Sequence, residues 1–216
     1  FRTFYGDEPK LPAKEKMELF AFRTYEDYRR YCVEQKAEAQ LNAAGFAASD
    51  SNTVVGWNKT RNGQQFLQTM VHEAAHLFWY RVAPGAQAPS WFAEGMATYF
   101  EGYAWDGKGY KLTFVSESRL PFAREAMKGG RQIPIADLIA GDALALINKD
   151  PTKALLFYAE CWALNYFLCR TQNKAWREAY AEYRQSVARG NAEPLTKFFP
   201  DLGRMEAEWV EFVKGM

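Results

Sequence analysis

Short apolar runs alternate with polar stretches through the first sixty residues. Residues 17–24 (MELFAFRT) and 52–59 (NTVVGWNK) show the alternation and the β-branched or aromatic content that are typical of strands. Residues 1–5 offer a further short strand. A helix is predicted over residues 24–43, between the strands at 17–24 and 52–59. Thr24 marks its start, and Gly45 lies just past its end. This region therefore predicts a small antiparallel or mixed sheet with one helix.

The strongest helical pattern covers residues 65–81. Apolar residues recur there at the three- and four-residue spacing of a buried helical face, and no proline or glycine interrupts them. Asn62-Gly63 before the pattern indicates a turn and a cap, and Pro84-Gly85 after it prevents continuation. We predict a helix over the whole segment.

The remainder of the chain is predicted to be mainly helical, with glycine-rich breaks at 104–109 and 128–132. Further helices are expected to start near Asp150, Asn173 and Asp201. The fold class that follows is α+β, with a small N-terminal β-sheet followed by a mainly helical body. We expect a single domain over residues 1–216, with a sheet-containing lobe at 1–60 and a helical lobe at 61–216.

Residues 154–169 form the most apolar stretch, and Glu160 is its only charged residue. A membrane-spanning helix needs about 20 apolar residues, so a central core helix is the better interpretation. Glu160 is expected to be a buried acid that pairs with an arginine, Arg119 or Arg124. No segment of this chain is predicted to span a membrane.

Two histidines, the only ones in the chain, lie four residues apart in the sequence His72-Glu73-Ala74-Ala75-His76. On a helix, positions i and i+4 share a face, so both imidazoles can converge on one ion, as they do in zinc sites. Glu73 lies beside them, where its carboxylate can accept a proton from a water that zinc has made acidic. The alternative is a surface helix on which the histidines have this spacing by chance.

A hydrolytic zinc site usually takes three protein ligands, and the segment SWFAEGMATYFE at residues 90–101 offers the third. Ser90 follows a proline and is a good N-cap for a second helix. Glu94 lies near the start of that helix, and the short loop before it lets the two helices pack together. The alternative for Glu94 is a solvated acid that the helix dipole favours.

These two motifs resemble the gluzincins, the thermolysin-like branch of zincin metallopeptidases, and more narrowly the peptidase MA-like domains. The strong similarity covers residues 65–103. It implies a zincin-like fold with the HExxH helix at the cleft, Zn²⁺ bound by His72, His76 and Glu94, and Glu73 as general base. Gluzincins often carry an acid four residues after the glutamate ligand to orient a ligating histidine. Here Thr98 stands at that position, and Glu101 is the candidate substitute.

Thermolysin-like enzymes also use a separate histidine to stabilise the transition state, and this chain has none left. Tyr158 is our candidate for that contact, because a positioned hydroxyl can stabilise an oxyanion. Tyr99, Tyr103 and Arg119 compete with it, and an ordinary core tyrosine is the alternative for Tyr158.

Gly56 and Trp57 lie on the strand just before the histidine-bearing helix. In thermolysin-like folds the edge strand at that place pairs with an extended substrate, and a glycine there lets the substrate backbone approach closely. We therefore predict Gly56 and Trp57 as substrate-binding residues. The alternative is an ordinary edge strand with a packing tryptophan.

Composition adds few constraints. The 216 residues are 48% hydrophobic and 16% aromatic, which suits a well-packed core, and the net charge of +1 gives no electrostatic reason to expect nucleic acid or an anionic membrane as partner. Cys161 and Cys169 are too far apart on one helix to bridge each other, whereas Cys32 can pair with either or remain free. Phe1 in place of methionine is what a removed signal peptide or a shortened chain would give, so a secreted or periplasmic location is favoured.

The function expected is zinc-dependent hydrolysis of peptide bonds in a peptide or protein substrate. Two alternatives stay open: a zinc-binding module of the same fold that no longer cleaves, and a zinc amidohydrolase acting on cell-wall peptides. The sequence does not predict an oligomeric state.

Overall fold

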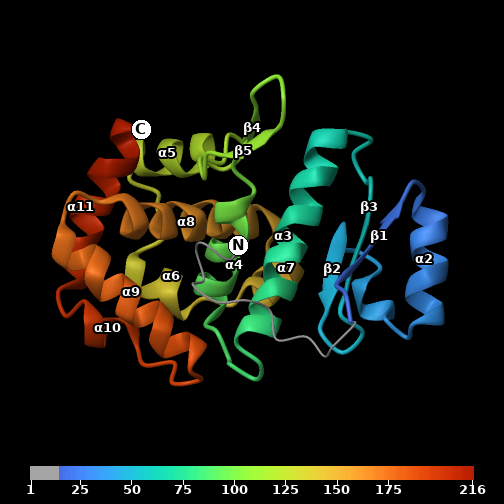
Figure 1. The fold of residues 1–216 in the computed structure, drawn as a ribbon. Helices are drawn as coiled ribbons and strands as arrows, with labels where there is room; N and C mark the ends of the chain where they lie inside the picture. The colour runs from blue at the N-terminus through green and yellow to red at the C-terminus, as the bar shows by residue number, and fades with distance from the viewer. Residues whose placement is uncertain (1–14) are drawn as a thin grey trace. The chain divides into compact units, whose positions relative to one another are not determined.

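The computed structural model describes residues 15–216, a mixed α+β protein whose strands lie mostly in the first third of the chain (Figure 1). This confirms the predicted fold class of a small N-terminal sheet followed by helices. The chain divides into two units, the first ending at Pro84 and the second beginning at Gly85. The strand predicted at residues 1–5 lies outside the described residues, and the single-domain organisation stays a prediction.

The first unit contains a mixed three-stranded sheet. Its strands are β1 (Glu18–Phe22), β2 (Gly45–Ala48) and β3 (Thr53–Trp57), in the order β1-β3-β2. Strand β1 runs parallel to β3, and β2 runs antiparallel to it. The two strands predicted from the alternating pattern are confirmed as β1 and β3. Because β3 is the central strand, its backbone hydrogen-bonding groups are used on both sides.

The helix after β1 is shorter than predicted. Helix α2 (Tyr25–Glu34) begins after Thr24, whose hydroxyl accepts from the Asp27 backbone N–H, so the predicted cap is confirmed. The predicted end at residue 43 is wrong, because Lys36 adopts a left-handed φ of 56° and a short 3₁₀ helix, η1 (Glu38–Gln40), follows. Gly45 does not end a helix. It opens β2, which the sequence pattern did not indicate.

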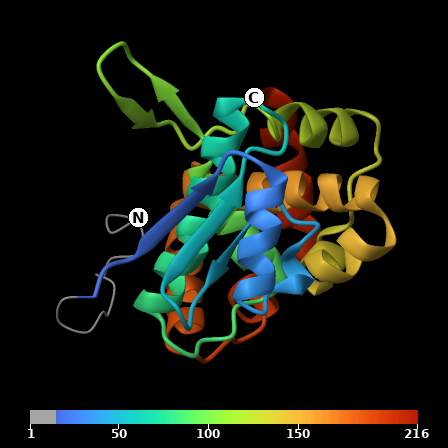
Figure 2. The same ribbon diagram turned by 90° about the vertical axis from the view of Figure 1, so that its right-hand side faces the viewer.

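Two helices cover opposite faces of this sheet (Figures 1 and 2). Tyr28 and Cys32 of α2 pack on Val55, while the neighbouring Val54 points the other way, toward α3 (Gly63–Val82). This opposition follows from the two-residue period of a strand. Each fully buried apolar side chain of this kind contributes roughly 1.5–3 kcal/mol, so both helices are firmly attached to the sheet.

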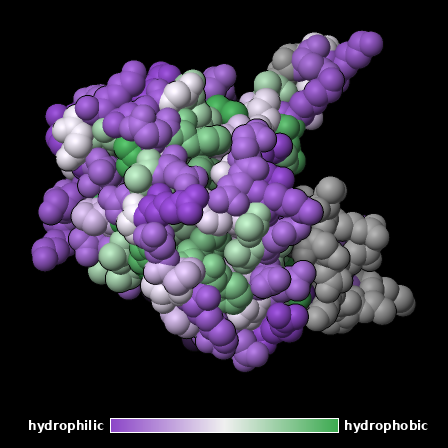
Figure 3. Space-filling model, turned by 90° about the vertical axis from the view of Figure 1, so that its left-hand side faces the viewer, coloured by the Kyte–Doolittle hydropathy of each residue, from purple (hydrophilic) through white to green (hydrophobic). Residues whose placement is uncertain are grey.

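The second unit is mainly helical. Its helices are α4 (Ser90–Phe100), α5 (Leu120–Lys128), α6 (Ile135–Ala140), α7 (Ala143–Lys149), α8 (Pro151–Arg170), α9 (Lys174–Ala188), α10 (Leu195–Phe198) and α11 (Leu202–Gly215). The predicted starts at Asp150, Asn173 and Asp201 are confirmed, since each caps the helix that follows with its side chain. On the face shown in Figure 3, hydrophilic side chains lie between the apolar ones.

Helix α8 is the core helix that the apolar stretch predicts. Its residues from Ala159 to Leu164 are at most 1% exposed. Among residues 15–216, none of the helices combines the length and apolar character that crossing a bilayer requires. The three cysteines are free, and Cys161 and Cys169 both belong to this helix.

Helices α4 and α8 pack tightly against each other at Gly95. A Cβ on Gly95 would overlap the Asn165 amide and would lie 2.5 Å from the carbonyl oxygen of Cys161. The Asn165 amide donates to that same Cys161 carbonyl at 3.0 Å, and its oxygen accepts from the Tyr180 hydroxyl. Only glycine allows the two backbones to approach this closely, so Gly95 fixes where α4 lies on α8.

A small hairpin follows α4. Strands β4 (Tyr103–Trp105) and β5 (Tyr110–Leu112) pair antiparallel, and the hairpin stands away from the helices (Figures 1 and 2). The glycine-rich break predicted at residues 104–109 is the turn of this hairpin, where the Asp106 carboxylate accepts from the backbone N–H groups of Lys108 and Gly109. The strands themselves were not predicted, because each is only three residues long.

Candidate metal centre

Helix α3 carries the two histidines and the glutamate of the motif. Asn62 caps its start by accepting from the backbone N–H groups of Gln64 and Gln65, which confirms the predicted cap. At the other end, the Arg81 guanidinium donates to Asn52 Oδ1 at 2.8 Å and also to the Ser49 carbonyl. Both ends of α3 are therefore fixed, and the motif lies in regular helix between them.

The two imidazoles of the motif face each other. The Nε2 atoms of His72 and His76 are 3.1 Å apart, and the ring centroids are 4.8 Å apart with the planes at 77°. Two nitrogens bound tetrahedrally to zinc at about 2.0–2.1 Å would lie about 3.3–3.4 Å apart. The observed pair needs an adjustment of only a few tenths of an ångström to hold one ion, so the geometry fits a bidentate histidine site.

The surroundings restrict both rings and the glutamate between them. His72 is 9% exposed, and the His76 ring stacks with Tyr80 at a centroid distance of 6.4 Å. Glu73 is half-buried beside strand β2, where a Cβ on Gly45 would lie 3.3 Å from Glu73 Cγ. Gly45 therefore leaves room for the Glu73 side chain. The glycine itself is the sequence signal for this contact, although the sequence pattern alone places Gly45 at a helix end.

Glu94 is the fifth residue of α4. The helix begins at Ser90 directly after Pro89, and its backbone is not capped by a side chain. The prediction of Ser90 as N-cap is therefore wrong, and its hydroxyl instead accepts from the Ala143 backbone N–H at 2.9 Å. The Glu94 side chain is half-buried, and its Oε2 atom is fully buried. Burial raises the pKa of the Cys161 thiol, and the negative charge of Glu94 raises it further.

Within the described residues, His72, His76 and Glu94 form a group that could hold a metal ion. Each offers one ligand atom, and these atoms lie within 4.8 Å of one another. Two imidazole nitrogens and one carboxylate oxygen are a donor set that zinc accepts in catalytic sites, where a fourth position remains for water. The donor chemistry and the histidine spacing both fit zinc, and they do not by themselves identify the metal.

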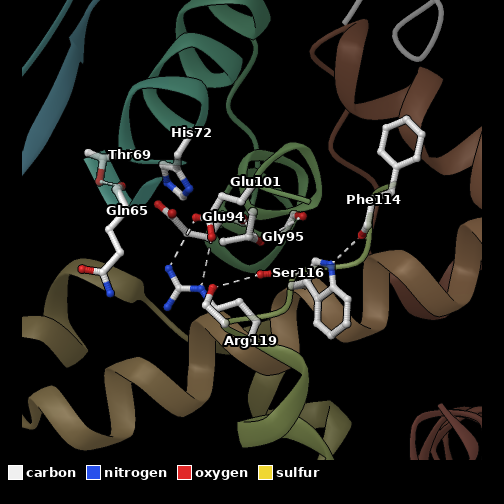
Figure 4. A network of polar contacts seen from close by, with 12 residues as sticks. Gln65, Thr69, His72, Glu94, Gly95, Glu101, Phe114, Ser116 and Arg119 are labelled. Atoms are coloured by element: carbon white, nitrogen blue, oxygen red, sulfur yellow. Dashed lines mark hydrogen bonds and ion pairs between the residues drawn. The ribbon is translucent and has the colours of Figure 1, made fainter. Parts of the chain in front are cut away.

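The two residues predicted to support the ligands have partners of their own. The Thr98 hydroxyl lies 2.6 Å from the Glu94 carbonyl oxygen, to which it donates. Glu101 is 4% exposed and accepts from Arg119 Nε at 3.3 Å and Nη2 at 3.4 Å (Figure 4). Thr98 thus stabilises the backbone that carries Glu94, and Glu101 forms an ion pair with the Arg119 guanidinium. Their predicted role in orienting a histidine stays a prediction.

Tyr158 belongs to the same network. The Arg119 guanidinium carbon lies 5.5 Å from the centroid of the Tyr158 ring, within the range of a cation–π contact. Tyr158 is half-buried on α8, the helix against which α4 packs at Gly95. Arg119, the other candidate for stabilising the transition state in this network, thus contacts Tyr158 and also Glu101.

The structure contradicts the edge-strand position on which the predicted substrate contact of Gly56 and Trp57 rests, and their role in substrate binding stays a prediction. Both lie on β3, the central strand, where Gly56 is paired with β1 on one side and β2 on the other. A Cβ on Gly56 would lie 2.7 Å from Met70 Sδ, so this glycine serves packing against α3. The Trp57 indole donates to the Ala43 carbonyl at 3.2 Å and packs on α2. The intervening strand β2, missed in the sequence, takes the position at the edge.

Glu160 also differs from expectation. It is fully buried, but its Oε2 atom accepts from the Ile133 backbone N–H at 2.9 Å instead of pairing with an arginine. Arg119, one of the two predicted partners, pairs with Glu101. Burial raises the Glu160 pKa to about 8, and the nearby Glu206 adds to the shift. At neutral pH Glu160 is therefore a protonated acid.

Comparison with known families gives one match. Residues 66–189 match the model of DUF1570, a family described as proteins of unknown function. The chain belongs to the DUF1570 family. The DUF1570 match covers more than half of the chain and includes the candidate ligands and Tyr158. No curated protein and no solved structure matches the chain. Membership of DUF1570 therefore brings no activity with it, and the chemistry has to be argued from the site.

Proposed function

We propose that this protein is a zinc-dependent peptidase in which Glu73 is the general base. The observation that carries the proposal is the group of His72, His76 and Glu94, whose ligand atoms lie within 4.8 Å of one another. Glu73 directly follows one of these ligands on α3. A site that only supported the fold would need no such acid beside it. The resemblance of both motifs to gluzincins adds to this reasoning.

In the proposed reaction, His72, His76 and Glu94 hold the metal ion. Zinc in such a site polarises the scissile carbonyl and lowers the pKa of water toward about 7. The Glu73 carboxylate takes a proton from the attacking water and returns it to the nitrogen of the leaving amine, so that no net proton is consumed. Gly45 allows the carboxylate the room that this transfer needs, since any Cβ there would crowd its Cγ atom.

The negative charge that develops on the carbonyl oxygen needs a donor, and we propose Tyr158 for it. Its hydroxyl is the donor, and the Arg119 guanidinium over its ring adds positive charge at the same place. Glu101 keeps that guanidinium in position through its two contacts. Arg119 is in this view a positioning residue for Tyr158.

An extended substrate would pair with strand β2. Among residues 15–216, β2 is an end strand of its sheet, and its first residue lies against Glu73. The outer edge of such a strand offers backbone N–H and C=O groups to an extended peptide. We therefore move the proposed substrate contact from β3 to β2.

The test combines metal content with cleavage. The purified protein is analysed for zinc by elemental analysis, and unfolded casein is the substrate. Glu73→Gln should keep zinc and lose cleavage by about 10²–10⁴-fold, the usual contribution of a general base. The control is Glu182→Gln, which changes an exposed glutamate on α9. Cleavage that survives Glu73→Gln with zinc still bound would refute the mechanism.

Two other outcomes decide between the proposed peptidase and its alternatives. Bound zinc with no cleavage of casein or of cell-wall peptides would make the protein a zinc-binding module. Cleavage of cell-wall peptides alone would make it an amidohydrolase of narrow specificity. Tyr158→Phe with normal zinc content should lower kcat more than it raises KM, because a transition-state contact is lost.

A further inference from the structure

A second candidate site lies in the helical unit and shares no residue with the metal centre. A cavity of about 520 Å³ is lined by residues of the loop before α6, of α6 and α7, and of the first half of α8. Figure 1 shows where these helices lie in the fold. The cavity volume lies within the range of about 300–1,000 Å³ that is usual for small-molecule sites. None of the three candidate metal ligands lines it.

The greater part of the cavity wall is apolar. Ile133, Leu146, Leu156 and Phe157 contribute to it. Gly141 brings the connection between α6 and α7 close to this wall, because a Cβ there would lie 2.5 Å from the Phe157 ring. An apolar group of a ligand is therefore the natural occupant of this part.

One part of the wall offers hydrogen-bond acceptors. Gln132 Oε1 is buried and has no hydrogen-bond partner among the described residues. A buried carbonyl without a partner destabilises the protein, so a ligand that donates a hydrogen bond to it binds more tightly. Asp137, in the first turn of α6, also lines the cavity and forms no ion pair within residues 15–216. Together they suit a cationic donor such as an ammonium group.

Another part carries positive charge. Lys149 closes the last turn of α7 and Lys153 lies in the first turn of α8, and both line the cavity. Neither forms an ion pair with any residue that the structure describes. The acids nearest in sequence, Asp142 and Asp150, use their carboxylates to cap α7 and α8. The two lysines thus remain available to a carboxylate.

We propose that this cavity binds a free α-amino acid with an apolar side chain. The side chain enters the apolar part, the ammonium group donates to Gln132 and Asp137, and the carboxylate meets Lys149 and Lys153. Each of the three recognition elements has its own set of residues among those that line the cavity. The proposal does not depend on the metal centre.

Isothermal titration calorimetry with L-leucine and three fragments tests each element. Isopentylamine lacks the carboxylate, 4-methylpentanoate lacks the ammonium group, and glycine lacks the side chain. L-Leucine should bind at least about tenfold more tightly than each of the three, the factor expected for one charge-assisted contact or a buried aliphatic group. N-acetyl-leucine and leucinamide, which represent the two ends of a peptide, should also bind more weakly. Equal binding of leucine and any of these five compounds would overturn the proposal.

Variants of the wall locate the binding. Ala145→Phe fills the cavity and should abolish leucine binding, whereas Ala136→Phe, on an exposed position of α6 outside the cavity, should not. The double change Lys149→Gln and Lys153→Gln should weaken leucine about tenfold and leave isopentylamine unaffected. Lys128→Gln is the matched surface control. Lys149 and Lys153 are both exposed, so the double variant is expected to fold, and unaltered leucine binding in it would refute the assignment. Zinc content should be unchanged throughout.

Discussion

Glu160 provides a direct test of how burial sets charge in this protein. Its carboxyl is fully buried in α8, and its Oε1 atom has no hydrogen-bond partner among the described residues. Burial is the main reason that its pKa rises from 4.5 to about 8, and the charge of Glu206 adds to it against the opposing N–H of Ile133. The folded protein therefore keeps Glu160 protonated at pH values where the unfolded chain has lost that proton.

The pH dependence follows from this difference. Below about pH 4.5 both states are protonated, and the residue causes no loss of stability. Between pH 4.5 and about 8 the folded state binds one more proton than the unfolded state, so the free energy of unfolding falls as pH rises. At about 1.4 kcal/mol per pH unit, a pKa difference of about 3.5 units gives a total loss of about 5 kcal/mol as an upper limit.

The Glu160→Gln variant removes the titration while its amide oxygen can still accept from Ile133. Wild type and variant are unfolded with urea at pH values from 4.5 to 8.5, and the difference in unfolding free energy is followed. It should change in favour of the variant by about 2–5 kcal/mol across this range. Glu182→Gln on the surface of α9 should show no such trend. A constant difference between wild type and Glu160→Gln at all pH values would show that Glu160 is not protonated in the folded state.

Three further changes test the packing, the helix cap and the metal. Gly95→Ala forces a Cβ onto Asn165 and should cost about 3 kcal/mol or more, a Tm loss of roughly 6–12 °C, whereas Gly203→Ala, with only one atom within 4 Å of the new Cβ, should be neutral. Asn62→Ala should destabilise the protein by about 1 kcal/mol through the loss of the α3 cap, and serine at this position should restore most of it; equal urea midpoints would refute the cap's contribution. Removing metal with a chelator should lower the Tm by several degrees and added zinc should restore it, but a His76→Ala variant should respond to neither; an unchanged wild-type Tm would count against a stably bound ion.

The helices were predictable wherever a cap and a period coincide. Asn62, Asp150, Asn173 and Asp201 each precede an apolar pattern and each caps the helix that follows. These signals are local, because a cap is a contact between residues two or three apart. Ser90 also precedes an apolar pattern, but Pro89 occupies the N-cap position of α4. The Ser90 hydroxyl instead accepts a hydrogen bond from the Ala143 backbone N–H, a distant contact that no local pattern encodes.

Strand β2 shows why the sheet was only half predicted. Its four residues are too few for an alternating pattern, and the chain before it turns at Lys36, a residue that seldom adopts a left-handed conformation. Without β2, the sequence predicts β3 as an edge strand, and this is the basis for predicting Gly56 and Trp57 as substrate-binding residues. The expected place of the substrate contact therefore depends on one short strand that the sequence pattern does not indicate.

In the candidate metal centre, too, local contacts follow from the sequence and long-range contacts do not. His72 and His76 converge because they are one helical turn apart, so the pair follows from sequence spacing alone. Tyr158 and Glu101 are far apart in sequence, and Arg119, which contacts both, joins them in one network. Such a network depends on the approach of α4 to α8, which Gly95 permits and which no periodicity predicts. The chain has no third histidine, so the proposed stabilisation of the oxyanion depends on Tyr158 and its contact with Arg119. Arg119→Lys keeps the positive charge but loses the planar contact with the ring. This substitution therefore separates the positioning of Tyr158 from the effect of charge alone.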